Sequence, residues 1–350
     1  MSTALQLRSS MRVAALVWVF VVSVSAQTLS SAVPAEIQVL LTTHDYPKAE
    51  QAIKEKLAAS PAWHTGHVLL AQIYNATGRY ELAERSGLAA VKLRESVDAL
   101  LALAMATLNQ RKLNDSIEWL DKAAKRQPGN PEIYKILGLD YAMGGMLRES
   151  GQAFQRAVKL APDNWELHYL DGRALYELEK FPDSEIALER AIERNPASVK
   201  AWTALGQVKD RLGDAASSEQ TYQKAVDLCG GAARDCAWPL LELGFLASRQ
   251  TGEKDAERYF RRAVEARPDW AKPHFYLGKT LAALGQLDAA CAQLEDAARL
   301  EPDQSQHQYQ LALVYRRLGS VEKAEQHLAR YRELVELERN KKTPAEFNVP

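Results

Sequence analysis

Residues 131–164 read PEIYKILGLDYAMGGMLRESGQAFQRAVKLAPDN, and this stretch decides the fold. Its apolar residues, including Tyr134 and Leu137, recur three or four positions apart, which is the spacing that predicts an amphipathic helix. Gly144-Gly145 interrupts this first helix, and a second apolar stripe of the same spacing follows it. Pro162 ends the second helix, because proline lacks an amide donor and disfavours helix in the residue before it. The segment therefore predicts two helices joined by a short turn.

The same pattern returns along most of the chain, in steps of 33 or 34 residues. Its strongest column places a small residue after an apolar one. A small side chain lets two helix axes approach closely, whereas a larger one holds them apart. The column consists of Ala71, Ala104, Gly138, Gly206, Gly244, Gly278 and Ala312, and Gly172, which follows Asp171, fills the one gap. The step from Gly206 to Gly244 is 38 residues, which indicates a four-residue insertion in the array.

These columns resemble the tetratricopeptide repeat, whose 34-residue pattern places small residues, aromatic residues and a closing proline at these offsets. The resemblance implies an all-α fold, a right-handed superhelical solenoid of about nine helix-turn-helix units whose first helices line a concave groove. We expect the solenoid at residues 27–338 and a C-terminal tail at residues 339–350. The repeats are expected at residues 30–63, 64–96, 97–130, 131–164, 165–198, 199–232, 237–270, 271–304 and 305–338.

The N-terminus differs from everything that follows it. Arg8 and Arg12 precede an apolar run from Val13 to Val22, and small residues ending at Ala26 come next. This order predicts a secretory signal peptide at residues 1–26, cleaved after Ala26. The apolar run is shorter than the roughly 20 residues that span a bilayer, which favours cleavage over the alternative of an uncleaved membrane anchor. We expect an exported protein, periplasmic or secreted, with no integral membrane span after cleavage.

The composition argues against several classes of function. Lys plus Arg number 44 against 45 Asp plus Glu, so the chain has no overall attraction to nucleic acid. The sequence contains no phosphate-binding glycine loop, zinc-protease helix motif or nucleophile elbow, and we predict no enzymatic activity, no cofactor and no metal site. His64 and His67 have a spacing compatible with joint metal ligation, but no third ligand accompanies them.

Each first helix carries a second stripe of residues beside the stripe that packs within the repeat. In the middle and C-terminal repeats this second stripe is rich in aromatic and basic residues, the composition of binding hot spots. We predict a groove for a peptide segment of a partner protein, with apolar anchors and some acidic character. The predicted partner-binding residues are Tyr169, Arg173, Tyr176, Trp238, Phe245, Arg249, Phe275, Lys279, Tyr309, Arg316 and Arg317, with Lys272 on the same stripe. The alternative is that the aromatic residues pack against neighbouring repeats.

The best-known binding device of this family is a clamp of Lys and Asn side chains that holds two carboxylates. The chain departs from that pattern at the offset of the clamp's Asn residues, which is occupied by Gln72, Met105, Leu139, Arg173 and Gln207. This departure disfavours an adaptor for cytosolic chaperones.

The chain has three cysteines, and two of them, Cys229 and Cys236, flank the insertion. In an oxidising compartment a disulfide between them would pin the enlarged loop, and the alternative is a pair of unbridged thiols. Cys291 is expected to be a small buried residue.

The sequence thus predicts a non-catalytic protein-binding scaffold or adaptor of an exported compartment. The alternative is a regulatory or substrate-docking subunit of a separately encoded envelope or secreted enzyme. In both cases the partners are one or more proteins that bind in the groove.

Overall fold

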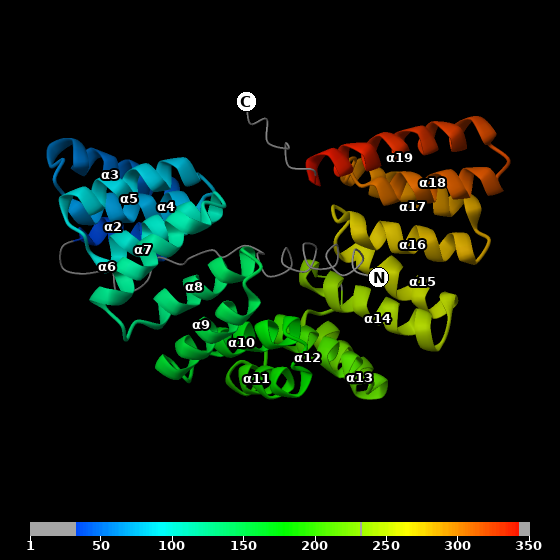
Figure 1. Cartoon of the computed structure of the whole chain (residues 1–350), viewed down its shortest axis with the longest axis horizontal. Helices are drawn as coiled ribbons and strands as arrows, with labels where there is room; N and C mark the ends of the chain where they lie inside the picture. The colour runs from blue at the N-terminus through cyan, green and yellow to red at the C-terminus, as the bar shows by residue number, and fades with distance from the viewer. Residues whose placement is uncertain (1–32, 232, 343–350) are drawn as a thin grey trace, which may run out of the picture. The chain divides into compact units, whose positions relative to one another are not determined.

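The computed structural model describes residues 33–231 and 233–342, and these residues form an all-α structure (Figure 1). They contain 18 α-helices and one short 3-10 helix. The predicted signal peptide at residues 1–26 lies outside the described residues. The chain divides between Arg194 and Asn195 into two compact units, which we describe one at a time.

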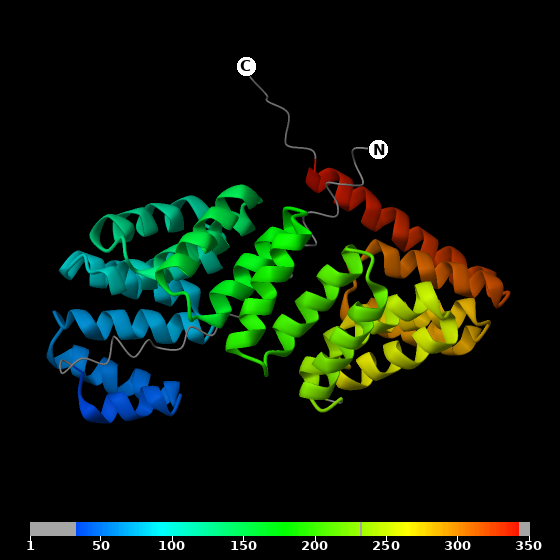
Figure 2. The ribbon, with the colours of Figure 1, turned by 90° about the horizontal axis from the view of Figure 1, so that it is seen from below.

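The N-terminal unit consists of paired helices joined by short turns, drawn in blue to green in Figures 1 and 2. Its described helices are α2 (Ala35–Thr42), α3 (Tyr46–Ala59), α4 (His64–Ala76), α5 (Tyr80–Leu93), α6 (Val97–Asn109), α7 (Leu113–Arg126), α8 (Pro131–Met143), α9 (Leu147–Leu160), α10 (Trp165–Glu177) and α11 (Phe181–Arg194).

The C-terminal unit continues the same alternation of first and second helices. Its described helices are α12 (Val199–Arg211), α13 (Ala215–Leu228), η2 (Arg234–Cys236), α14 (Ala237–Gln250), α15 (Glu253–Ala266), α16 (Ala271–Ala283), α17 (Leu287–Leu300), α18 (Ser305–Arg317) and α19 (Val321–Lys342). The predicted all-α fold of about nine helical hairpins is confirmed. The last helix, α19, extends to Lys342, into the segment that we expected as a C-terminal tail.

In five hairpins the glycine of the first helix faces a large side chain of the second helix, 16 residues later. A Cβ atom on Gly244 would lie 2.3 Å from Cε1 of Phe260, and one on Gly138 would lie 2.5 Å from Cε1 of Phe154. Both phenylalanine side chains are buried. These distances are far shorter than the separation of about 3.5–4.0 Å at which carbon atoms pack. The column of small residues therefore marks the place where the two helices of a hairpin approach most closely.

Buried serines fix the same approach by hydrogen bonds. In four hairpins a serine hydroxyl of the second helix donates to the carbonyl of the small residue 12 positions earlier. The donor and acceptor pairs are Ser116 to Ala104, Ser150 to Gly138, Ser184 to Gly172 and Ser218 to Gly206, at distances of 2.9, 2.7, 2.6 and 2.9 Å. A buried hydroxyl without a partner would be unfavourable, so this bond satisfies the serine while it holds the helices together.

A second kind of hydrogen bond joins consecutive hairpins. In five first helices the fourth residue reaches back to the carbonyl of the proline near the end of the preceding repeat. Nε2 of His168 lies 2.7 Å from the carbonyl oxygen of Pro162, and Nε1 of Trp202 donates to that of Pro196 at 2.9 Å. Equivalent contacts join His67 to Pro61, Tyr134 to Pro128 and His274 to Pro268. The prolines that end the second helices thus also anchor the helices that follow.

Candidate functional site

In the N-terminal unit, three of the predicted partner-binding residues lie on α10. The guanidinium of Arg173 lies over the ring of Tyr176, 5.6 Å from its centroid, and 3.8 Å from the carboxylate of Glu177. Tyr169 packs beside Trp165, with ring centroids 6.5 Å apart. Arg173 is only 9% exposed, so most of its side chain is withdrawn from solvent.

In the C-terminal unit, a larger aromatic cluster lies on α14, α16 and the connector before α16. The indole ring of Trp238 stacks on that of Trp270, with centroids 5.0 Å apart and planes inclined by 14°. Phe245 meets Tyr276 edge to face, with centroids 4.5 Å apart. All four side chains are half-buried, so each ring packs within the unit and keeps part of its surface exposed.

Two lysines of α16 lie over these rings. Nζ of Lys272 is 5.0 Å from the ring centroid of Trp238 and 5.7 Å from that of Phe245. Nζ of Lys279 is 5.7 Å from the ring centroid of Tyr276. An ammonium group within about 6 Å of a ring centroid is attracted by the ring's quadrupole. We call the following six residues the aromatic–lysine face: Trp238, Phe245, Trp270, Lys272, Tyr276 and Lys279.

The position of Phe275 corrects one part of the predicted groove. Its side chain is 7% exposed and packs against Tyr276 and His307, so it belongs to the buried layer and offers almost no surface to a partner. The alternative interpretation, packing against a neighbouring repeat, holds for this residue. The burial of Arg173 likewise leaves it little surface to offer a partner.

Two further predicted residues lie on α14 and α18. Nη2 of Arg249 donates to both carboxylate oxygens of Asp210, at 2.7 and 2.8 Å. Tyr309 is 41% exposed and lies beside Tyr331, with ring centroids 5.2 Å apart. Arg249 is therefore engaged within the unit, whereas Tyr309 presents much of its ring to solvent.

The last two predicted residues are consecutive arginines near the end of α18. Nη2 of Arg316 lies 3.4 Å from Oε1 of Glu325. Nη1 of Arg317 donates to the carbonyl oxygen of Ala282 at 2.7 Å. Both side chains remain exposed.

Sequence reasoning missed Trp270 and Tyr276. Trp270 precedes α16 and follows Pro268 by two residues, so it lies in a connector, outside the helical stripe. The one signal in the sequence that could have pointed to Trp270 was its place two residues after the closing proline, Pro268. Burial raises the pKa of the Tyr276 hydroxyl, and the carboxylate of Glu242 raises it further, so this ring stays a neutral phenol at neutral pH.

The insertion is tied to the connector that carries Trp270. The structure joins Cys229 and Cys236 by a disulfide, with Cα atoms 5.6 Å apart. Arg234, in η2, places Nη2 at 2.7 Å from Oδ2 of Asp269. Because Asp269 immediately precedes Trp270, the enlarged loop is held against one edge of the aromatic–lysine face.

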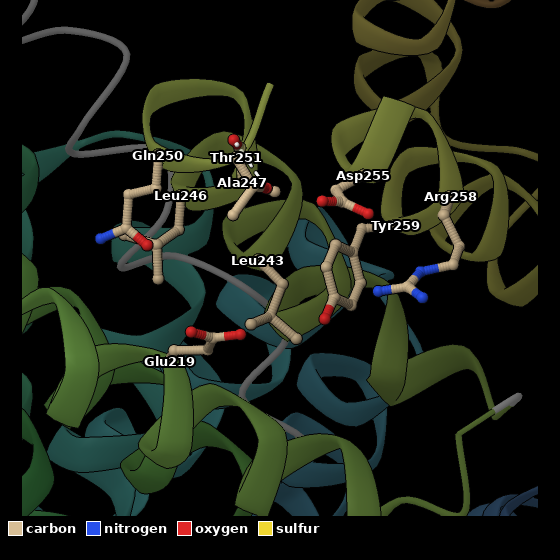
Figure 3. A pocket seen from close by; sticks show the side chains of 9 residues that line it. All are labelled: Glu219, Leu243, Leu246, Ala247, Gln250, Thr251, Asp255, Arg258 and Tyr259. Carbon is tan, nitrogen blue, oxygen red and sulfur yellow. Dashed lines mark hydrogen bonds between the residues drawn. The ribbon is translucent and has the colours of Figure 1, made fainter. Parts of the chain in front are cut away.

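A small hollow lies between α13, α14 and α15, on the part of the C-terminal unit shown in Figure 3. Leu243 and Leu246 line it from α14, Glu219 lines it from α13, and Tyr259 lines it from α15. Its volume of about 70 Å³ is far below the roughly 300 Å³ of a small-molecule site. The hollow offers no room for a substrate.

Within the described ranges, no three His, Cys, Asp or Glu side chains gather closely enough to hold a metal ion. Nε2 of His64 contacts the carbonyl oxygen of Arg94 at 3.1 Å and the hydroxyl of Ser96 at 3.2 Å. The thiol of Cys291 is buried and unbridged. Residues 33–231 and 233–342 also contain no helix with the length and apolar character that a membrane span requires.

Four segments of the chain match the family model of the tetratricopeptide repeat, at residues 35–96, 88–131, 169–233 and 275–336. These segments make up more than half of the sequence, and the chain belongs to the tetratricopeptide-repeat family. Proteins of this family bind other proteins and are generally non-catalytic scaffolds.

Curated relatives share the repeats at low identity. The chain is 22% identical over 202 residues to anaphase-promoting complex subunit 3 of Schizosaccharomyces pombe, covering 57% of this chain and 30% of that protein. It is 24% identical over 247 residues to the CTR9 homologue of Arabidopsis thaliana, covering 67% of this chain and 22% of that protein. The chain spans less than a third of the length of these relatives.

Solved structures show the same fold. Yeast Tom70 aligns with a TM-score of 0.62 at 16% identity, over 97% of this chain and 75% of that chain. A tetratricopeptide repeat protein from Parabacteroides merdae aligns with a TM-score of 0.58 at 16% identity, over 72% of this chain and 98% of that chain. Identities this low establish the likeness of fold alone.

Proposed function

We propose that the chain is a non-catalytic scaffold of an exported compartment, which binds a peptide segment of a partner protein on the aromatic–lysine face. The observation that carries this proposal is the group of half-buried rings on α14, on α16 and in the connector before α16. Rigid aromatic side chains provide a large contact area at a low cost in conformational entropy. Tyr309, on the next first helix of the unit, adds an exposed ring.

Two observations support export. Residues 1–26 have the order of basic, apolar and small residues that marks a secretory signal peptide. The disulfide between Cys229 and Cys236 belongs to a type that persists in the periplasm or outside the cell and is rare in a reducing cytosol. Removal of residues 1–26 would release the protein into that compartment, whereas an uncleaved segment would anchor it to the membrane.

A photo-crosslinking amino acid at position 309, on α18, the first helix of the repeat after α16, tests for a partner bound beside the aromatic–lysine face in cells that naturally make the protein. Tyr309 is exposed and aromatic, so an aromatic crosslinker fits there with little disturbance. The matched control is position 224, where Lys224 is exposed on the second helix α13. We expect protein adducts from position 309 that position 224 does not give. Equal capture of the same proteins at both positions would contradict the assignment of the face.

The captured proteins also separate the scaffold from its alternative. Recovery of structural envelope proteins supports the scaffold. Recovery of a single enzyme in a one-to-one ratio supports a regulatory or substrate-docking subunit. Fractionation of the same cells, with mass analysis of the mature N-terminus, tests export: processing after Ala26 would leave Gln27 as the first residue.

A further inference from the structure

Two lysines of α16 differ from the arginines on the neighbouring first helices. Lys272 and Lys279 are seven residues apart on one helix, so they share a face and their Cα atoms lie about 10.5 Å apart along the axis. Arg249 is bonded to Asp210, and Arg317 is bonded to a backbone carbonyl. Among the described residues, no carboxylate oxygen lies within 4.0 Å of Nζ of either lysine, the distance that defines an ion pair.

The nearby carboxylates of Glu242 and Glu301 form no ion pair with Lys272 or Lys279. Oε1 of Glu242 accepts a hydrogen bond from Gln207 at 2.9 Å. Burial raises the pKa of Glu301, and the charge of Lys272 offsets part of that rise without a direct ion pair. The described contacts of Lys272 and Lys279 are with aromatic rings.

The rings also restrict where the two ammonium groups can lie. A free lysine side chain loses conformational entropy when a partner immobilises it. Lys272 already lies over Trp238 and Phe245, and Lys279 lies over Phe275 and Tyr276, so part of that loss precedes binding. An ammonium group has three N–H donors, and the ring contact leaves donors available for a carboxylate.

We propose that Lys272 and Lys279 together recognise an acidic peptide segment with two carboxylate side chains about 10 Å apart on one side of its backbone. The inference rests on the proposed function and specifies its ligand. In a polyproline II conformation, residues three apart point to the same side at about 9.3 Å, which fits this spacing. In a β-strand, the same-side spacings of about 7 and 13 Å fit less well. The side chains between the two carboxylates would meet the exposed parts of the half-buried rings.

Fluorescence anisotropy with the purified chain and labelled synthetic peptides tests the proposal. The first probe has two glutamates three positions apart, with proline and phenylalanine between them. The second probe has glutamines in place of the glutamates. We expect the glutamate peptide to bind about tenfold more tightly or better, and added salt to reduce the difference. Equal affinity for the two peptides would overturn the proposal.

A pair of double variants locates the binding to α16. The double variant Lys272→Gln with Lys279→Gln should bind the glutamate peptide about tenfold more weakly. It should no longer prefer the glutamate peptide over the glutamine peptide. Lys224→Gln with Lys254→Gln removes the same charge from exposed positions on second helices and should change the affinity by less than about twofold. Circular dichroism checks that both variants remain helical. Unchanged affinity in the first variant would show that these lysines do not form the site.

Two further measurements sharpen the interpretation. Peptides with glutamates two or four positions apart should bind more weakly, and equal binding at every spacing would rule out recognition at two points. If an acidic polysaccharide of matched charge binds as tightly as the glutamate peptide, the lysines attract anions in general and do not recognise a peptide, which would overturn the proposal. If position 309 still captures a partner while no acidic peptide binds, the proposed function stands and this inference fails.

Discussion

The hydroxyl oxygen of Ser116 on α7 lies 2.7 Å from Oδ2 of Asp140 on α8. The same hydroxyl lies 2.9 Å from the carbonyl oxygen of Ala104, in the bond that equivalent serines make in other repeats. A hydroxyl has one hydrogen, so Ser116 can donate fully to only one of these two oxygens at a time. When Asp140 is protonated, it can donate to Ser116 and leave the serine hydrogen for Ala104. Burial raises the pKa of Asp140 to about 7, although the hydrogen bond from Ser116 to the carboxylate offsets part of that rise.

Asp140 should therefore make the N-terminal unit more stable in mild acid than at pH 8. Its pKa is about 7 in the folded protein against 3.8 for an unperturbed aspartate. As the pH rises between these values, the unfolded state loses the proton while the folded state keeps it, so stability falls and then levels off. The amide in Asp140→Asn can still donate to Ser116. We expect this variant to gain about 1–3 kcal/mol in unfolding free energy at pH 8 and little at pH 4.

Urea unfolding at the two pH values measures this effect. Asp163→Asn is the control, because Asp163 is exposed in the connector before α10, and it should change stability by less than about 0.5 kcal/mol at either pH. An equal effect of Asp140→Asn at pH 4 and pH 8 would mean that the folded protein does not hold the extra proton.

Glu50 should show the opposite dependence on pH. Burial alone would raise the pKa of its carboxyl group, but hydrogen bonds from Arg79, Lys54 and Tyr74 outweigh this effect and lower the pKa to about 2. Because this value lies below the ordinary 4.5, the stabilisation is present above pH 4.5 and is lost as the pH falls toward 2. We expect Glu50→Gln to lower the unfolding free energy by about 2 kcal/mol at pH 7 and to have little effect near pH 2. Exposed Glu81, replaced by Gln, is the control in the same urea titrations.

A methyl group at Gly244 should overpack its hairpin. The added Cβ would lie 2.3 Å from Phe260, and we expect Gly244→Ala to lower the unfolding free energy by about 1–3 kcal/mol. Gly129→Ala is the control, because an added Cβ there meets no heavy atom within 4 Å. Adding Phe260→Leu to Gly244→Ala should recover part of the loss, because it makes room for the methyl group. Failure of this second change to recover any stability would show that the helices do not repack around the smaller side chain.

Loss of the disulfide should destabilise the C-terminal unit. Cys229 and Cys236 are seven positions apart, and the chain-entropy model assigns about 2.5 kcal/mol to closing so short a loop. We expect replacement of both by serine to lower the melting temperature by about 5–10 °C in calorimetry. Adding a reductant should lower the melting temperature of the unaltered protein by a similar amount. It should leave the melting temperature of the double variant unchanged.

A thiol titration of the unfolded protein taken from its native compartment offers an independent check. Of the three cysteines in the chain, only Cys291 should react before reduction, because the other two form the bridge. Three reactive thiols before reduction would contradict both the bridge and the oxidising compartment.

The order of the helices could be predicted because each hairpin leaves marks that are local in the sequence. A glycine such as Gly138 marks the close approach of two helices, and a proline such as Pro162 marks the end of the second helix. Both act through steric limits that depend little on distant residues. These marks recur at a fixed spacing, so a single repeat could be extended along the chain.

The depth of each site residue could not be predicted in the same way. Phe275 and Lys279 occupy one stripe of α16, yet Phe275 is covered by His307 of the next first helix while Lys279 stays exposed. That difference depends on contacts between repeats, about 30 residues apart in sequence. The role of Trp270 depends equally on its stacking with Trp238, which no local pattern records.

The contact between His168 and Pro162 bears on how such an array can lengthen. It spans the point where one repeat ends and the next begins, so a cut between these two residues separates the partners. A segment that runs from one hairpin turn to the next carries both of them. Duplication or exchange of turn-to-turn segments therefore preserves the joint. The module best suited to recombination in this chain is a second helix together with the first helix that follows it.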